Sequence, residues 1–178
     1  MVYLFLANGV EEVEALFPLD LLRRGGVQVT TLGIGGEEIV GSHGIHLFAD
    51  RRDLFFRDPA PEMVILPGGM PGASNLDASP VVEQAIRACL SSGGYLAAIC
   101  AAPFLLGKRG LLQGKKVTCY PGFEGQLIGA KVSRKKVVHD GKIITAAGVG
   151  VAKEFGLELL RTLKGNAVAN DVKEKILG

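Results

Sequence analysis

The stretch GGYLAAICAAPFLLGKRG, from Gly93 to Gly110, places an apolar strand-like run directly before a helix-like run. The first run, Tyr95–Ile99, has the length of a buried strand, and the second, Ala101–Arg109, ends in two basic residues before a glycine, as many helices do. A buried strand that passes straight into a helix is typical of parallel α/β sheets. Cys100 lies at the joint between the two runs, where it could either fill space or perform chemistry.

The rest of the chain repeats this alternation. Strand-like runs occupy Val2–Ala7, Val27–Ile34, Met63–Gly69 and Lys115–Pro121, with hairpin patterns over Glu37–Asp50 and Lys136–Gly148. Helical periodicity occupies about Glu11–Arg24, Pro80–Ser91, Val149–Lys164 and Ala167–Leu177. Such alternation predicts an α/β fold with a mainly parallel sheet and helices on both faces.

Composition and charge argue against several classes of function. The 20 basic and 18 acidic side chains give a net charge of +2, and the basic residues are scattered, which does not indicate a nucleic-acid surface. The longest nearly apolar run, Tyr95–Leu106, is shorter than the roughly 20 residues that a membrane span needs. The opening segment, Met1–Glu12, has no basic region before its apolar run, so we expect neither a signal peptide nor membrane attachment.

Length and cysteine count favour one domain in a reducing compartment. The 178 residues can bury a sizeable core, and no linker or repeat divides them, so we expect a single domain over residues 1–178. Three cysteines without close pairs do not indicate a disulfide framework, which favours the cytoplasm. The histidines lie far from the cysteines in sequence, so the spacing predicts no Cys/His metal site.

Three loops that follow parallel strands should meet at one edge of the sheet, because ligand sites in such folds lie beyond the carboxyl ends of the strands. They are Asn8–Glu14, Gly68–Gly72 and the joint at Cys100. A helix N-terminus favours an anion, so this joint should lower the pKa of a thiol. The alternative is a packing cysteine. Cys89 is better explained by packing, whereas Cys119, near a strand end, is open to either interpretation.

Glu14 is the acid best placed to act with Cys100. On a helix it shares an apolar stripe with Val10, Phe17, Pro18 and Leu21. Partial desolvation there would raise its pKa, and the neutral acid could donate to a thiolate or move a proton. The alternative is an acid at the edge of the stripe that reaches water. Glu11 and Glu12 instead suit the first helical turn, where the dipole stabilises acids.

The glycines of LPGGMPG, Leu66–Gly72, allow a sharp turn with bare backbone N–H groups. Together with the N–H of Ala101, these groups could form an oxyanion hole. The spacing is not that of a dinucleotide fingerprint, and the later stretch Gly148–Lys153 lacks the third glycine and the downstream acid that such a fingerprint needs. A nucleotide site is therefore not expected.

The stretches ANGVEEVEALFPLDLLRRGG, VILPGGMPGASNL and AAICAAP occur in this order. With them the chain resembles the ThiJ/PfpI superfamily from Val2 to about Ala169, most of all the branch that contains the Parkinson-disease protein deglycase and its bacterial relatives. The resemblance implies a flavodoxin-like sandwich, a homodimer and chemistry without a cofactor. It also implies glyoxalase activity on 2-oxoaldehydes such as methylglyoxal, deglycation of amines and thiols, and a redox-regulated chaperone role.

By this resemblance, Cys100 matches the nucleophilic, readily oxidised cysteine of the family, and Glu14 matches the protonated glutamate that hydrogen-bonds it. Gly69 and Ala101 match the backbone donors around the cysteine. Ala101 also stands where the protease-like branch has a histidine, which argues against peptidase activity. Tyr120 stands where several relatives carry a histidine. Its hydroxyl could contact substrate but is a poor base at neutral pH, so proton transfer would fall to Glu14.

Two functions would use these residues. In the first, a glyoxalase III-like hydro-lyase or deglycase, Cys100 attacks a 2-oxoaldehyde or its adduct, and Glu14 moves a proton to give a 2-hydroxy acid. In the second, oxidation of Cys100 switches a stress sensor or chaperone that has little physiological catalysis. The sequence predicts one site for both functions and does not separate them.

Overall fold

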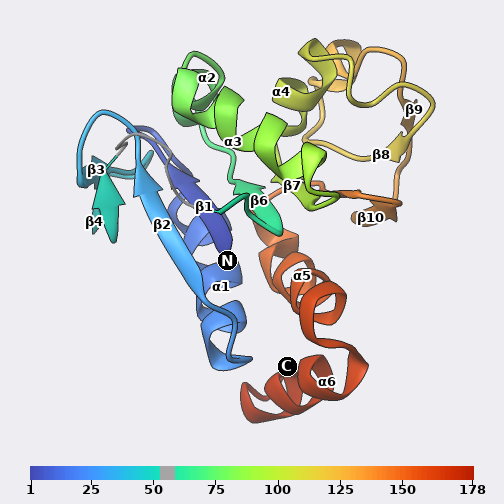
Figure 1. Ribbon diagram of the computed structural model, residues 1–178. Helices are drawn as coiled ribbons and strands as arrows, with labels where there is room; N and C mark the ends of the chain where they lie inside the picture. Colours follow the sequence, from blue (N-terminus) through green and yellow to red (C-terminus); the bar gives the residue numbers. More distant parts are fainter. Residues whose placement is uncertain (53–58) are drawn as a thin grey trace.

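The computed structural model describes residues 1–52 and 59–178, and its described strands form one large sheet and two small ones (Figure 1). The large sheet has the strand order β10-β11-β7-β6-β1-β2-β5. These strands are β1 Val2–Leu6, β2 Val29–Gly33, β5 Arg51–Arg52, β6 Met63–Leu66, β7 Tyr95–Ile99, β10 Val137–Asp140 and β11 Ile143–Ala146. The pairs are parallel except for β10 with β11, which is the predicted hairpin.

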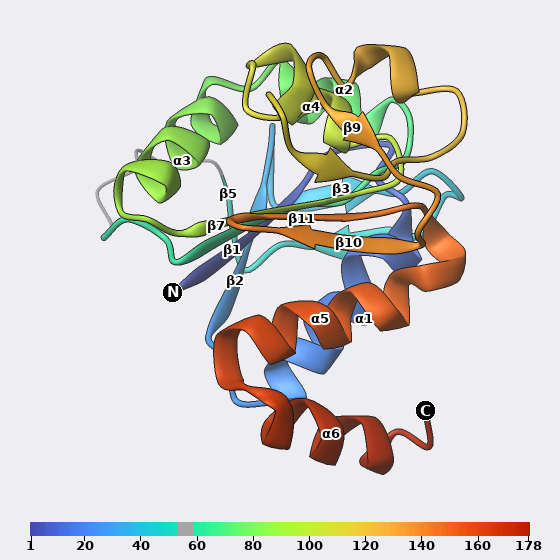
Figure 2. The same ribbon diagram turned by 90° about the vertical axis from the view of Figure 1, so that its right-hand side faces the viewer.

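Helices cover both faces of this sheet (Figure 2). One face carries α1 Glu12–Arg24 and α5 Ala152–Lys164, with α6 Asn166–Lys175 packed against α5 on the same side. The other face carries α2 Gly72–Asp77, α3 Pro80–Ser91 and α4 Pro103–Lys108. The prediction of an α/β sandwich with a mainly parallel sheet is therefore confirmed. Among the described residues, no helix combines the length and the apolar character that crossing a membrane requires.

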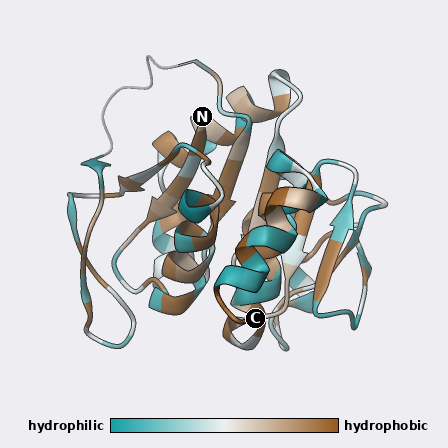
Figure 3. Ribbon diagram, turned by 90° about the horizontal axis from the view of Figure 1, so that it is seen from below, coloured by the Kyte–Doolittle hydropathy of each residue, from teal (hydrophilic) through white to brown (hydrophobic). Residues whose placement is uncertain are grey.

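The core lies in two layers because successive side chains of a strand point to opposite faces of the sheet. Leu4 of β1 packs in the layer beneath α1 and α5, whereas Phe5 packs in the layer beneath α3. All residues of β1 are buried, as expected for a central strand that is covered on both sides. The strands between the helices are mostly brown in Figure 3, the colour of apolar residues.

Two local features explain where α3 begins and how closely α5 packs against α1. Ser79 caps α3, because its side chain accepts from the N–H of Val82 at 3.4 Å, and Pro80 follows as the first helical residue. Gly156 lets α5 approach α1 closely, since a Cβ atom there would lie 2.9 Å from Pro18 Cα.

Several short elements differ from the sequence-based prediction. The helix after Cys100 begins at Pro103 rather than Ala101, because residues 100–102 form a turn. The predicted strand over Lys115–Pro121 shrinks to β8 Lys116–Val117, which pairs with β9 Lys131–Val132 in a separate small sheet. Three elements have the bounds β3 Glu38–Val40, β4 His46–Phe48 and the 3-10 turn η1 Glu124–Gln126, and a second 3-10 turn, η2 Val149–Val151, precedes α5.

Candidate active site

The three predicted loops meet beyond the carboxyl ends of β1, β6 and β7. The N–H of Glu11 donates to the carbonyl of Gly68 at 3.0 Å, which joins the first loop to the second. The N–H of Cys100 donates to the carbonyl of Ala146 on β11 at 2.9 Å. The carbonyl of Cys100 in turn accepts from the N–H of Tyr120 at 2.8 Å, so a fourth segment joins the site.

Cys100 has a left-handed backbone conformation, with a φ of 64°. For an L-residue this conformation costs about 1 to 2 kcal/mol, because Cβ approaches the following carbonyl oxygen. The turn directs the chain from β7 into α4 and leaves the cysteine half-buried, in contrast to its buried neighbours Ala101 and Ala102. The strained turn therefore holds the sulfur at the partly accessible end of a buried strand.

Glu14, on the first turns of α1, is fully buried. Its Oε2 accepts from the N–H of Gly68 at 3.0 Å, and its carboxyl hydrogen-bonds the side chain of Cys100. Oε1 has no hydrogen-bond partner among the described residues. Burial raises the pKa of Glu14 to about 7, although the bonds from Cys100 and Gly68 oppose the rise. The expected desolvation of Glu14 is confirmed.

The pKa of the Cys100 thiol differs from the expectation. Burial, followed by the charge of Glu14 and the hydrogen bond to it, raises this pKa to about 12. The N–H groups of Ala101 and Gly69 hydrogen-bond the sulfur and oppose the rise. Position in the turn before a short helix therefore does not by itself give a thiolate. A protonated Glu14 removes this repulsion and can donate to the sulfur, so the acid form of Glu14 favours the thiolate.

The remaining candidates have distinct settings. Tyr120 is half exposed, and a Cβ atom on Gly148 would lie 3.2 Å from its ring. Cys89 is buried in α3 and its thiol donates to the carbonyl of Tyr95 at 3.2 Å, which matches a packing role. Cys119 is buried too, next to Tyr120, and burial raises the pKa of its thiol to about 11.

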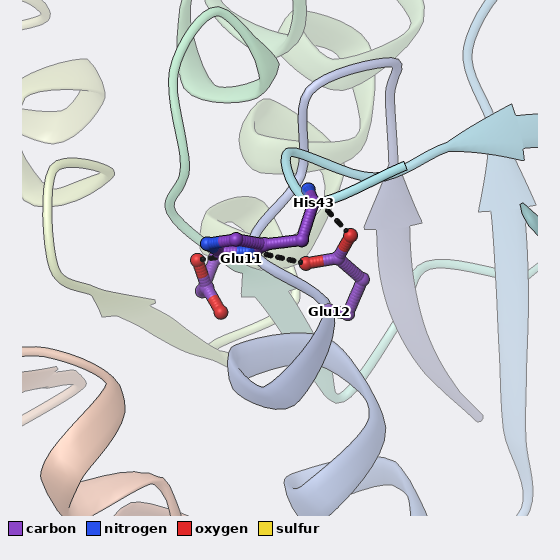
Figure 4. Close-up of side chains that lie close together, drawn as sticks. All are labelled: Glu11, Glu12 and His43. Atoms are coloured by element: carbon purple, nitrogen blue, oxygen red, sulfur yellow. Dashed lines mark hydrogen bonds and ion pairs between the residues drawn. The ribbon is translucent and has the colours of Figure 1, made fainter. Parts of the chain in front are cut away.

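A second polar cluster at the start of α1 was missed by the sequence analysis (Figure 4). Glu12 is buried, and its two oxygens lie 2.8 Å from the backbone N and 2.9 Å from the Nδ1 of His43. Glu11 Oε2 lies 3.5 Å from the same Nδ1. The ligand atoms of the three residues lie within 4.8 Å of one another, close enough to share a metal ion, but their mutual hydrogen bonds already explain the arrangement.

The shifted pKa values in this cluster favour an ion pair between Glu12 and His43, which we call the clamp. Although burial opposes the shift, hydrogen bonds to the side chain and backbone of His43 lower the pKa of Glu12 to about 2. The same bond to Glu12, with the charge of Glu11, raises the pKa of His43. The cluster ties the turn between β3 and β4 to α1. No sequence signal links His43 to these acids, because the contact depends on how the turn folds back.

The chain is similar in sequence and in fold to proteins of one family. A family model described as "DJ-1/PfpI family" matches residues 1–162. The Parkinson disease protein 7 homolog of Danio rerio is 36% identical over 178 residues, covering 97% of this chain and 94% of the relative. The glutathione-independent glyoxalase DJR-1.2 of Caenorhabditis elegans is 32% identical over 164 residues, covering 91% and 87%. The structure of oxidized Toxoplasma gondii DJ-1 superposes with a TM-score of 0.94 at 31% identity, covering 99% and 97%.

Proposed function

Since this chain belongs to the DJ-1/PfpI family, we propose that it is a cofactor-independent cysteine enzyme that converts 2-oxoaldehydes, or their early adducts on amines and thiols, to 2-hydroxy acids. The observation that supports this most directly is the contact between Glu14 and Cys100, in which a carboxyl with a pKa of about 7 can hold or release a proton at the sulfur. A relative that is 32% identical is named a glutathione-independent glyoxalase, which supports the same class of reaction.

The proposed reaction begins with attack of the Cys100 thiolate on the aldehyde carbon. A carbon–sulfur bond forms, the carbonyl electrons move to oxygen, and the proton of Glu14 passes to that oxygen, which gives a hemithioacetal and leaves Glu14 as a carboxylate. The N–H groups of Gly69 and Ala101, which already bond the sulfur, lie where they can also bind the new oxyanion. The whole conversion needs no external oxidant or reductant, because the aldehyde carbon of the substrate is oxidised while its neighbouring carbon is reduced.

Glu14 then moves a proton from the former aldehyde carbon to the adjacent carbon through an enediol. A carboxyl with a pKa of about 7 suits both steps, since it can accept and return a proton near neutral pH. The resulting thioester of Cys100 is cleaved by water, which releases the 2-hydroxy acid and restores the thiol. On an early adduct of an amine or thiol, the bond from the aldehyde carbon to nitrogen or sulfur breaks as the Cys100 thiolate takes its place, and the amine or thiol leaves with a proton. The hemithioacetal that results then follows the same steps to the acid.

The test is the formation of lactate from methylglyoxal, in the absence of glutathione, with separate measurement of its two enantiomers. We expect one enantiomer from the parent protein and none above background from Cys100→Ser or Glu14→Gln. Glu37→Gln changes an exposed acid in the same way and should leave the rate unchanged. Stoichiometric loss of methylglyoxal without lactate would reject the enzyme and indicate only an alkylated thiol.

A second function, a redox-sensing stress protein or chaperone, is supported by the different exposure of the three thiols. Cys100 is half-buried, whereas Cys89 and Cys119 are buried. Oxygens added to the Cys100 sulfur would meet the N–H groups of Gly69 and Ala101 and a protonated Glu14. After mild peroxide treatment, peptide mass spectrometry should find sulfinate at Cys100 before the other cysteines. Even oxidation of all three would reject a tuned sensor.

We also infer a homodimer, which the family resemblance implies and which four exposed apolar side chains support. Val13 and Leu16 of α1 are 46% and 40% exposed, and Ile45 and Phe48 of the adjoining hairpin are 52% and 74% exposed. The clamp between Glu12 and His43 joins these two elements. Sedimentation analysis should show a dimer that Phe48→Ser weakens. A monomer at micromolar concentration would contradict this inference.

A further inference from the structure

An ion-pair network joins the two segments that supply the backbone donors to Cys100. Arg109 follows α4 directly, and its side chain is 16% exposed. Its Nη1 lies 2.6 Å from Asp77 Oδ1, and its Nε lies 2.5 Å from Glu83 Oε2. The guanidinium also donates to the main-chain carbonyls of Asp77, at 3.1 Å, and of Leu105, at 2.8 Å. One side chain thus binds α2, α3 and α4 together.

Each donor is joined to this network by one short helix. The carbonyl of Gly69 accepts from the N–H of Ala73 in α2 at 2.9 Å, and α2 ends at Asp77. The carbonyl of Ala101 accepts from the N–H of Phe104 in α4 at 3.1 Å, and Arg109 is the residue that caps α4. Both helices have six residues, so each spans only about 9 Å. The contact between Asp77 and Arg109, at the ends of α2 and α4, therefore limits where Gly69 and Ala101 can lie around the sulfur.

We propose that Arg109 is a positioning residue for the Cys100 site, which holds the end of α4 against the end of α2 and so fixes the N–H groups of Gly69 and Ala101 around the sulfur. The planar guanidinium can bind two carboxylates and a carbonyl in one plane, which an ammonium group cannot do. This proposal rests on the proposed function only in taking Cys100 as the reacting group.

The burial of the network supports this role. The side chain of Asp77 is 14% exposed, so water competes little for the Arg109–Asp77 pair. Lys108 adds a further contact to Asp77 from a more exposed position. By contrast, Arg87 is 77% exposed where it pairs with Glu83 along the surface of α3. Exposed pairs of that kind contribute little to the free energy of folding. A shielded pair between two helices, in contrast, restricts their relative position.

The test measures the rate at which iodoacetamide alkylates Cys100 as a function of pH, with peptide mass spectrometry to separate the three cysteines. For Arg109→Gln we expect about tenfold slower alkylation at one pH, the effect of losing one hydrogen bond to a charged group, and a profile moved to higher pH. Arg109→Lys should give an intermediate rate. The matched control Arg87→Ala removes another arginine from Glu83 and should match the parent.

Asp77→Asn should reproduce the effect, and combining it with Arg109→Gln should add little, because both changes break one contact. If Arg109→Gln lowers only the melting temperature while its alkylation profile overlaps that of Arg87→Ala, Arg109 only stabilises the fold and the proposal is wrong. If Arg109→Gln does not fold, Arg109→Lys and Asp77→Asn decide by the same comparison. A parent protein that forms no lactate would reject the proposed function, yet the alkylation profiles would still decide the role of Arg109.

Discussion

Glu14 and Cys100 meet beside a residue that has no side chain. A Cβ atom on Gly68 would lie 2.6 Å from Glu14 Oε2 and 2.7 Å from Cys100 Cβ, closer than such atoms can approach. The N–H of Gly68 also donates to the same carboxylate oxygen at 3.0 Å. The glycine therefore provides both the space for the acid–thiol contact and one of the bonds that orient the acid.

Gly68→Ala should disrupt this contact, because the added methyl group would overlap both partners. We expect a loss of about 1 to 3 kcal/mol in the free energy of unfolding, the usual cost of overpacking, together with slower alkylation of Cys100. Urea unfolding and iodoacetamide kinetics measure the two effects. Gly125→Ala is the control, since its Cβ atom would meet nothing within 4 Å. Equal stability of the two variants would show that the site tolerates the methyl group.

Glu14→Gln should make stability depend less on pH. The pKa of Glu14 is about 7 in the folded protein, above its ordinary value of 4.5, so the folded state binds the proton more tightly. That contribution is fully present below about pH 4.5 and is lost as the pH rises through about 7, a change of about 3 kcal/mol. Urea unfolding of the parent should therefore show a fall in stability between about pH 5 and pH 8.

Glutamine does not ionise, so Glu14→Gln should show a shallower fall over the same range. Glu37→Gln, an exposed control, should keep the slope of the parent. Parallel curves for the parent and Glu14→Gln would mean that the pKa of Glu14 is not raised.

Cys100→Gly should be more stable than Cys100→Ala by about 1 kcal/mol. The reason is the φ of 64° at this position, which glycine adopts without the steric cost that any L-side chain meets. Urea unfolding measures the stability of the two variants. The alanine variant is the matched control for the glycine variant, because both lack the thiol. An alanine variant that equals the glycine variant would show that the turn is unstrained.

Glu12→Gln should destabilise the protein by about 1 to 3 kcal/mol at neutral pH, because a buried carboxylate loses charge-assisted bonds to His43. The pKa of Glu12 is about 2, below its ordinary value, so its contribution is present above about pH 4.5 and is lost as the pH falls through about 2. The control is Glu38→Gln, whose pair with His46 is exposed and should contribute less than about 1 kcal/mol. Equal unfolding midpoints would contradict a stabilising clamp.

Much of the fold could be predicted because its signals are local. The bounds of β7 and α3 match the predicted Tyr95–Ile99 and Pro80–Ser91, where an apolar run and a capped amphipathic period mark both ends. The helix α2 was missed because GASNLD has no helical apolar period, and its burial of Ala73 and Leu76 becomes apparent only in the fold.

The sequence by itself determined most strands of the large sheet and the long helices, and where three loops follow parallel strands. It also determined that Glu14 lies on the apolar stripe of its helix, since periodicity and turn residues act over short stretches of chain. Only the tertiary structure decided the pKa of the Cys100 thiol, the clamp of Glu12 on His43, and the binding of Arg109 to two other helices. Desolvation and ion pairing depend on which distant segments cover a group, and that arrangement exists only once the sheet has brought its strands together.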